Sequence, residues 1–150
     1  MKEEFMREAL KEAKKAYKKK EVPVGCVIVR DNKIIARAHN NRESKKNGLY
    51  HAEVLCINKA CKKLHSWRLD DCSIYVTLEP CPMCSGAILQ TKIKNIYYGA
   101  SDPKAGFAGS RYNVFDMKFN YSPNLYGGIL EDECSMLIKD FFKELRNNKF

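Results

Sequence analysis

The order in which helical and strand patterns alternate along the chain constrains its fold more than any other feature. Helical spacing of apolar residues predicts a first helix over residues 2–19. Two runs rich in β-branched residues follow at 24–30 and 33–38, and turn residues between them predict a hairpin. The remaining predicted elements are helices over 51–64, 82–91 and 131–146 and strands over 73–78 and 93–100. This alternation predicts an α/β layer structure with a mixed sheet.

The rest of the chain predicts loops and a single folded unit. Polar residues at 40–50 and a Gly-, Ala- and Pro-rich run at 101–110 indicate loops, whereas 111–128 is ambiguous. The sequence shows no internal repeat and no low-complexity linker. With 150 residues, the chain is expected to form one domain over 1–150.

The charge balance of the chain is strongly basic. It has 27 Lys and Arg residues against 18 Asp and Glu residues, for a formal net charge of +9. Such a balance favours an anionic partner, and nucleic acid is the first candidate. A lysine-rich surface that only keeps the protein in solution is the alternative, and charge alone does not decide between them.

The start of the sequence and its hydropathy predict a cytoplasmic location. The first ten residues, MKEEFMREAL, carry charges and no apolar run, so a secretory signal is not expected. No segment approaches the roughly 20 apolar residues of a membrane helix. A soluble cytoplasmic protein without a membrane partner is the simplest expectation.

The cysteines divide into a close pair and a scattered set. There are seven, an odd number, and in a reducing compartment they are expected to be free or to bind metal. Cys81 and Cys84 form a Cys-x-x-Cys pair. The scattered cysteines are interpreted mostly as small apolar filler of the core; they are Cys26, Cys56, Cys61, Cys72 and Cys134.

The Cys-Pro-Met-Cys pair opens a predicted helix, where free N–H groups favour thiolates. A spacing of three residues puts both sulfurs on one side of the first turn, within reach of one ion. A redox dithiol and half of a structural zinc site are the alternatives. A closed structural site needs four ligands, but the sequence has no second Cys-x-x-Cys. Three protein ligands would leave a position open for water, which is the catalytic pattern.

His51 is the candidate third ligand, and Glu53 is the candidate catalytic residue. His39 and His65 end predicted elements, where surface positions are expected. His51 differs because Glu53 follows two residues later and Pro-Cys-x-x-Cys lies thirty residues on. Deamination of an aromatic base needs protons at a ring nitrogen and at the departing amine, and a carboxylate beside activated water can carry both. For Glu53 alone, a solvated position in the first helical turn is the alternative.

The combined pattern His-x-Glu…Pro-Cys-x-x-Cys is the known signature of zinc nucleobase deaminases. Beyond the signature, the sequence resembles the family of bacterial tRNA-specific adenosine deaminases over nearly its whole length. The matching blocks are 21–25, Asn40, 51–53, 77–88, 98–104, 109–110, 119–120, 128–130, 133–134 and 141–142.

This resemblance implies a fold, a reaction and an assembly. The fold is cytidine-deaminase-like, a three-layer α/β/α structure with a mixed five-stranded sheet. The reaction is hydrolytic deamination of adenosine to inosine at the wobble position of an arginine tRNA anticodon. Activated water at one zinc ion per subunit is the expected nucleophile, with Glu53 as proton shuttle. The expected partners are the tRNA anticodon stem-loop and a second copy of the chain in a homodimer.

The resemblance also assigns substrate contacts, residue by residue. Asn40 matches the asparagine that binds the base, although a turn asparagine after a strand is the simpler interpretation of its spacing. Asp102 and Lys104 match the loop that lines the anticodon path. The positions expected to contact flanking nucleotides are Asn120, Phe142 and Arg146, of which Phe142 also fits the apolar stripe of its helix.

Two segments depart from the family pattern, and two other functions stay open. The chain has Asn-Gly-Leu-Tyr at 47–50 where the family usually has Asp-Pro-Thr-Ala, and Tyr121 where it often has His. Both departures lie where substrate contacts are expected. A free-base or nucleoside deaminase acting on guanine or cytosine would share the metal site. A nucleic-acid-binding module with structural zinc would have no use for Glu53.

Overall fold

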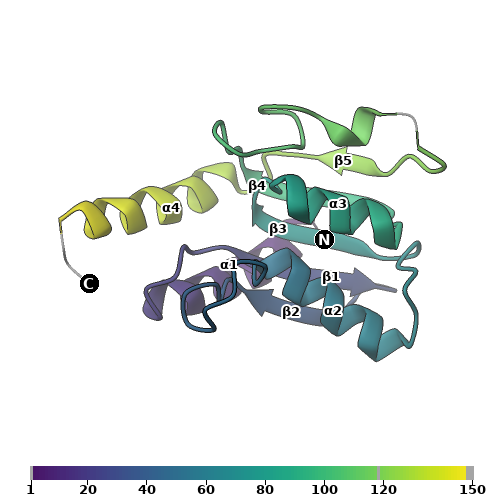
Figure 1. Cartoon of the computed structure of the whole chain (residues 1–150), viewed down its shortest axis with the longest axis horizontal. Helices are drawn as coiled ribbons and strands as arrows, with labels where there is room; N and C mark the ends of the chain where they lie inside the picture. The colour runs from purple at the N-terminus through teal and green to yellow at the C-terminus, as the bar shows by residue number, and fades with distance from the viewer. Residues whose placement is uncertain (1, 118, 148–150) are drawn as a thin grey trace.

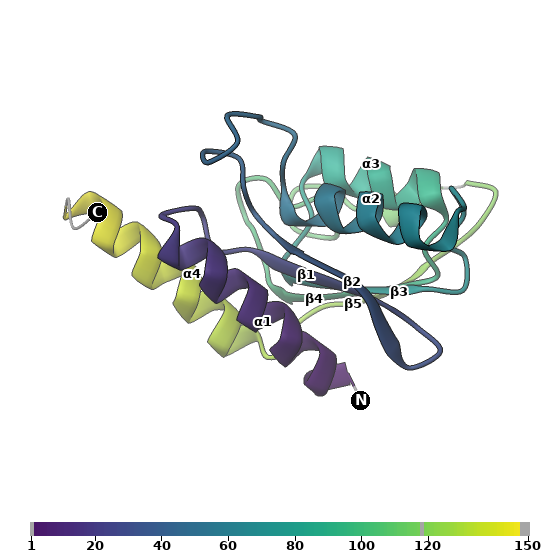
Figure 2. The same ribbon diagram turned by 90° about the horizontal axis from the view of Figure 1, so that it is seen from below.

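The protein folds into three layers around a five-stranded sheet (Figures 1 and 2). The computed structural model describes residues 2–117 and 119–147. The strands are β1 (Gly25–Arg30), β2 (Lys33–His39), β3 (Ser73–Leu78), β4 (Asn95–Ala100) and β5 (Asn124–Tyr126), and the helices are α1 (Lys2–Lys18), α2 (Ala52–Leu64), α3 (Pro82–Thr91) and α4 (Glu131–Arg146), with a short 3-10 helix at Val114–Asp116. The predicted α/β/α fold with a mixed five-stranded sheet is confirmed.

Strand pairing explains the mixed character of the sheet. The order is β2-β1-β3-β4-β5. β1 runs antiparallel to both β2 and β3, whereas β4 runs parallel to β3 and β5 runs parallel to β4. Asp31 and Asn32 both take positive φ at the turn between β1 and β2, which is the conformation a tight hairpin turn needs. The predicted hairpin is therefore present.

Two apolar clusters bury the two faces of the sheet. Figure 2 shows α2 and α3 on one face and α1 and α4 on the other. Ile28, Ile74 and Ile96 point toward α2 and α3, whereas Val27 and Tyr75 point toward α1, as alternation along a strand requires. α1 packs so closely that a Cβ on Gly25 would lie 1.9 Å from the carbonyl oxygen of Ala9.

One edge of the sheet gathers the segments that form the site. Gly25 at the start of β1 pairs with His39 at the end of β2, and Leu78 at the end of β3 pairs with Ala100 at the end of β4. The loops that follow β2, β3 and β4 therefore leave the sheet at the same edge. The loop after β2 leads directly into α2, and the loop after β3 leads directly into α3.

The segment that was ambiguous in sequence, 111–128, contains the 3-10 helix and the edge strand β5. β5 has three residues, too few to show a period of two, so its pattern could not reveal it. The predicted strand 93–100 is two residues longer than β4. Ile93 is apolar and buried in the core like a strand residue, but it lies before the strand begins. The other predicted boundaries agree with the structure to within one residue.

Four of the five scattered cysteines are buried as predicted. Cys26, Cys56 and Cys72 belong to the cluster beneath α2 and α3, and Cys134 belongs to the cluster beneath α1 and α4. Cys61 is partly buried at the margin of the first cluster. Among the described residues, no helix combines the length and apolar character needed to cross a membrane.

Candidate metal centre and active site

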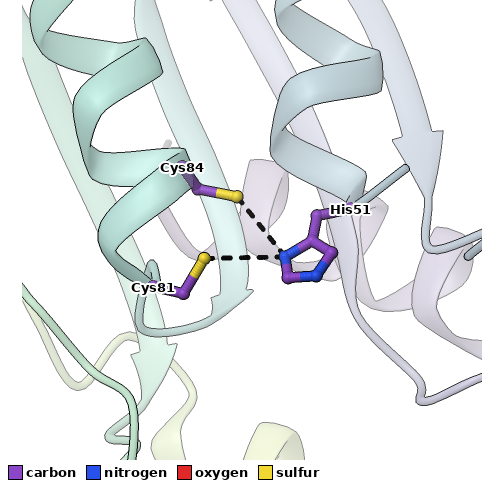
Figure 3. Close-up of side chains that lie close together, drawn as sticks. All are labelled: His51, Cys81 and Cys84. Atoms are coloured by element: carbon purple, nitrogen blue, oxygen red, sulfur yellow. Dashed lines mark hydrogen bonds between the residues drawn. The ribbon is translucent and has the colours of Figure 1, made fainter. Parts of the chain in front are cut away.

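Three side chains from two helix starts converge at the sheet edge. His51 is the N-cap of α2, Cys81 is the N-cap of α3, and Cys84 lies in the first turn of α3. Pro82 occupies the first turn of α3, where its missing N–H costs no helical hydrogen bond. The Nδ1 atom of His51 lies 3.6 Å from the Sγ atom of each cysteine (Figure 3).

The spacing of these atoms fits one tetrahedral ion. Bonds of about 2.3 Å to sulfur and about 2.0–2.1 Å to nitrogen at a tetrahedral angle separate the two ligand atoms by about 3.6 Å. The three ligand atoms lie within 4.8 Å of one another. Within residues 2–117 and 119–147, the group contains these three side chains and no fourth. Two thiols and an imidazole suit zinc, and three ligands match the number found in catalytic sites.

The electrostatics of the pair favour the thiolate that a metal requires. The pKa of Cys81 is lowered to about 4, chiefly because the Cys84 thiol hydrogen-bonds to its sulfur, with a further contribution from His51. That same hydrogen bond raises the pKa of Cys84 and, together with burial, keeps its proton. The hydrogen bond with Cys81 also raises the pKa of His51. A metal ion binds thiolates, so metal binding would release the proton that Cys84 holds.

Glu53 lies in the first turn of α2, beside the convergent ligands. Its side chain is 4% exposed, so the solvated position considered from sequence is wrong. Burial raises the pKa of Glu53 to about 7. A carboxyl group with this pKa can both accept and donate a proton near neutral pH, which is what a general acid and base must do.

A cavity of about 320 Å³ opens beside these residues. Its wall includes His51, Cys81 and Glu53 together with Asn40 and Asp102 from two loops. A space of this size lies at the lower end of the range for small-molecule sites. The structure thereby brings together five of the residues predicted from sequence.

Asn40 is buried and has part of its hydrogen-bonding capacity in use. Its Nδ2 group donates to the carbonyl oxygen of Val22 (3.2 Å), and its Oδ1 atom accepts from the N–H of Arg42 (3.1 Å). An amide can make four hydrogen bonds, so one N–H and one lone pair remain for a base edge. The two bonds to the backbone fix the amide in the wall of the cavity.

A groove of about 760 Å³ adjoins the cavity. The residues that line both spaces are Val22, Leu78, Asp102 and Ala105. Lys104 from the loop after β4 and Phe142 and Arg146 from α4 line this groove, with Lys139 beside them. Phe142 is 38% exposed, so its ring is accessible as well as part of the apolar stripe of α4. Asn120 is exposed in the segment before β5 and lines neither space, so the structure does not bring it to the other predicted contacts.

The cavity wall also contains residues that the sequence did not single out. Glu21, Arg42 and Glu43 come from the segments flanking β1 and β2, whereas Glu79 and Ala105 flank β3 and β4. Glu21 and Glu79 belong to blocks that matched the family, but nothing in their spacing assigned them a role. Their fully buried carboxylates are evident only in three dimensions.

The two departures from the family pattern lie in different surroundings. Tyr121 donates a hydrogen bond from its hydroxyl to the carbonyl oxygen of Ile88 (3.2 Å), near the end of α3, and Lys92 lies over its ring. Tyr121 therefore fastens the segment before β5 to α3. In the 47–50 run, Asn47 accepts a hydrogen bond from the N–H of Leu49 (2.9 Å), which shapes the turn before His51.

Comparisons with known proteins show the family of the chain. The model of the MafB19-like deaminase family matches residues 1–146. A curated tRNA-specific adenosine deaminase of Bacillus subtilis (strain 168) is 48% identical over 146 residues, which cover 97% of this chain and 91% of that protein. The chain belongs to the tRNA-specific adenosine deaminase family.

Two solved structures extend the likeness to three dimensions. A chain from studies of A-to-I editing by tRNA:A34 deaminases at the wobble position of transfer RNA superposes with a TM-score of 0.85 at 40% identity, covering 89% of this chain and 98% of that one. The guanine deaminase of Bacillus subtilis superposes with a TM-score of 0.65 at 37% identity, covering 80% of each chain. The deaminase is thus an enzyme whose fold is shared by relatives that act on different bases.

Proposed function

We propose that the deaminase converts adenosine to inosine at the wobble position of a tRNA anticodon, with arginine tRNA as the expected substrate. The observation that carries this proposal is the groove with Lys104, Phe142 and Arg146, which continues directly from the cavity. Cationic side chains hold phosphates, and an aromatic ring stacks on an unpaired base. An anticodon loop presents its bases splayed out, so little unstacking energy is needed to insert one. A substrate as small as a free base would leave the groove unused.

We propose that His51, Cys81 and Cys84 hold one zinc ion per subunit, the ion their donor atoms fit. When bound there, zinc would activate a water molecule as the nucleophile. The Glu53 carboxylate would accept one proton from the water and pass it to the N1 atom of the base as the C6–O bond forms. It would then accept the second proton from the new hydroxyl and pass it to the amine, so that the C6–N bond breaks and ammonia leaves. The buried position of Glu53, in the first turn of α2 and in the cavity wall with His51 and Cys81, supports this role.

The remaining residues are proposed to bind and orient the substrate. Asn40 offers one N–H and one lone pair to the base edge, and the loop bearing Asp102 and Lys104 lines the path of the flanking nucleotides. Phe142 and Arg146 contact the nucleotides in the groove. For Asn120 the proposal rests on the sequence resemblance alone, because it lies outside both spaces.

We further propose that residues 1–150 act as one domain in a homodimer in the cytoplasm, where tRNA is found. The homodimer rests on the sequence resemblance, and large apolar side chains on the surface are available for such a contact. Five of them are more than half exposed: Leu49 (60%), Trp67 (61%), Tyr112 (64%), Met117 (58%) and Met136 (57%). Light scattering on the purified protein would give the mass of the assembly.

An anticodon stem-loop assay tests the substrate. The protein is incubated with an arginine stem-loop bearing adenosine at the wobble position and, separately, with one bearing guanosine there. Inosine in the first RNA and no xanthosine in the second is the expected result. The second candidate, a free-base or nucleoside deaminase, is favoured by the likeness to the guanine deaminase. Ammonia release from free guanine or cytidine, with the adenosine stem-loop unchanged, would select it.

A further inference from the structure

Two loops supply much of the cavity wall, and neither is part of a helix or strand. The loop after β2 contributes Asn40, Arg42 and Glu43, and the loop after β4 contributes Asp102 and Ala105. They leave the sheet at the same edge, with β1 and β3 between them. A loop without a regular ladder needs other partners for its backbone N–H groups if it is to keep one shape.

The loop after β4 is folded around the carboxylate of Glu79, which is 2% exposed. The Oε1 atom of Glu79 accepts a hydrogen bond from the N–H of Asp102 (3.0 Å) and one from the hydroxyl of Ser110. The Oε2 atom accepts from the N–H groups of Ala108 and Ser110, each at 3.0 Å. All four acceptor sites of the carboxylate are therefore occupied by one loop.

Gly106 shows how closely this loop surrounds Glu79. A Cβ at position 106 would lie 2.3 Å from the carboxyl carbon and 2.4–2.5 Å from both carboxyl oxygens of Glu79. Only a residue without a side chain fits this approach. Within the same loop, Asp102 accepts hydrogen bonds from the N–H groups of Lys104 and Ala105, each at 3.1 Å. Glu79 thus holds the backbone of Asp102, and the Asp102 side chain in turn holds the backbone of Lys104.

Glu21 holds the loop after β2 in the same way. It is 1% exposed and precedes β1. Its Oε1 atom accepts from the N–H of Glu43 (3.0 Å), and its Oε2 atom accepts from the N–H (2.5 Å) and the hydroxyl (2.6 Å) of Ser44. Hydrogen bonds of backbone N–H groups to a carboxylate are stronger than those to a neutral acceptor. Each of the two loops therefore has its own buried anchor.

We propose that Glu21 and Glu79 are positioning residues that set the two loop walls of the cavity independently of each other. Neither carries protons in the reaction: the four acceptor sites of Glu79 and three of those of Glu21 are used by the loops. The loop after β4, held by Glu79, places Asp102 and Lys104 beside the nucleotides. The loop after β2, held by Glu21, carries Arg42, whose backbone N–H donates a hydrogen bond to Asn40. The inference deepens the proposed function and rests on it for the identity of the substrate.

Hydrogen exchange tests the anchors without any need for activity. Glu→Gln replaces one acceptor oxygen with an NH₂ donor, which faces N–H groups and cannot bind them. In Glu79→Gln we expect the amides of Asp102, Ala108 and Ser110 to exchange at least about tenfold faster, an opening free energy change of about 1.4 kcal/mol. The amides of Glu43 and Ser44 keep their wild-type rates. Glu21→Gln gives the reverse pattern, so each variant is the control for the other.

Kinetics with the adenosine stem-loop supply the second readout. Because the walls hold the substrate and Glu53 moves the protons, we expect KM to rise in both variants more than kcat falls, with kcat/KM reduced by roughly 10- to 100-fold. Glu3→Gln, the same chemical change on the exposed first turn of α1, should behave as wild type. Zinc content should stay at the wild-type level in all three proteins.

Milder variants keep the test informative if a Gln variant does not fold. Ser110→Ala removes one donor to Glu79, and Ser44→Ala removes one donor to Glu21. Each should loosen only its own loop. Uniformly faster exchange, unchanged exchange in both loops, or a fall in kcat at constant KM would overturn the positioning role. If the wild type edits no stem-loop, the proposed function fails, whereas the crossed exchange pattern still decides whether the anchors exist.

Discussion

The Nδ1 atom of His51 lies 3.6 Å from the Sγ atom of Cys84, although the two residues belong to the starts of different helices. Parallel packing of α2 and α3 on one face of the sheet produces this contact (Figure 2). Because the ends of the strands fix where both helices begin, the fold itself brings these ligand atoms together.

Removal of His51 should therefore remove the metal. His51→Ala leaves two thiols, and we expect the purified variant to hold well under one zinc per chain and to lose activity together with the metal. Metal analysis after dialysis against a weak chelator measures this. His65→Ala is the matched control, because His65 is exposed at the end of α2. Stoichiometric zinc in His51→Ala would show that the ligand set is wrong.

A variant of Glu53 distinguishes an enzyme from a nucleic-acid-binding module with structural zinc. Glu53→Gln keeps the shape of the side chain but cannot carry a proton, so we expect kcat to fall by at least about 10²- to 10⁴-fold. The variant should keep its zinc and bind the stem-loop with wild-type affinity, because Glu53 is not among the convergent ligands. Inosine formation at the wild-type rate would exclude the proposed proton shuttle.

Salt dependence of RNA binding tests the groove. If Arg146 neutralises one phosphate, Arg146→Ala should reduce the slope of log K against log salt by about 0.7–0.9. Fluorescence anisotropy with the stem-loop, measured on the Glu53→Gln background to prevent turnover, gives the slope. Arg68→Ala is the control: Arg68 pairs with Asp70 in the loop after α2, and it lines neither the cavity nor the groove. Equal slopes for the two variants would contradict a phosphate contact at Arg146.

The sequence was sufficient to predict the long elements and the close approach of Cys81 and Cys84, for a shared physical reason. Helices such as α4 repeat their apolar residues with a fixed period, strands such as β3 are short continuous buried runs, and Cys81 and Cys84 are related by the pitch of one helical turn. These are local patterns. β5 has three residues and is defined by its pairing with β4, which no local pattern shows.

Local sequence patterns also could not show that Glu21 and Glu79 anchor the walls of the cavity. Glu79 is an anchor because backbone N–H groups of residues 102, 108 and 110 meet its carboxylate, and a backbone group leaves no signature in the sequence. Asn120 illustrates the opposite case, in which a matching block suggested a contact that the position of the residue does not support. Family motifs therefore predicted the convergence of His51, Cys81 and Cys84 but not the surrounding wall.

Close packing of α1 on β1 predicts a stability effect at Gly25. A Cβ there would lie 1.9 Å from the carbonyl oxygen of Ala9 and 2.4 Å from the N atom of Ala13, so the helix must move away. We expect Gly25→Ala to lower the free energy of unfolding by about 1–3 kcal/mol, the usual cost of overpacking. Urea unfolding measures it. Gly48→Ala should change stability little, because a Cβ at Gly48 has nothing within 4 Å.

Acid should weaken the contribution that Glu21 makes to stability. Burial by itself would raise the pKa of Glu21, but hydrogen bonds from the Ser44 hydroxyl and from the N–H groups of Glu43 and Ser44 outweigh it and lower the pKa. The folded state therefore holds the carboxylate more tightly than the unfolded chain does. This stabilisation is fully present above the unfolded pKa of about 4.3 and is lost as the pH falls through the lower folded value.

Glu21→Gln should consequently reduce the free energy of unfolding by about 1–3 kcal/mol at pH 7 and by progressively less as the pH falls below about 4. Urea unfolding of the wild type and the variant at equal zinc loading, at several pH values between 3 and 7, gives the difference. Glu3→Gln controls for the loss of one negative charge, because Glu3 is exposed on α1. A difference that stays constant across this range would mean that Glu21 acts through its shape and not through its charge.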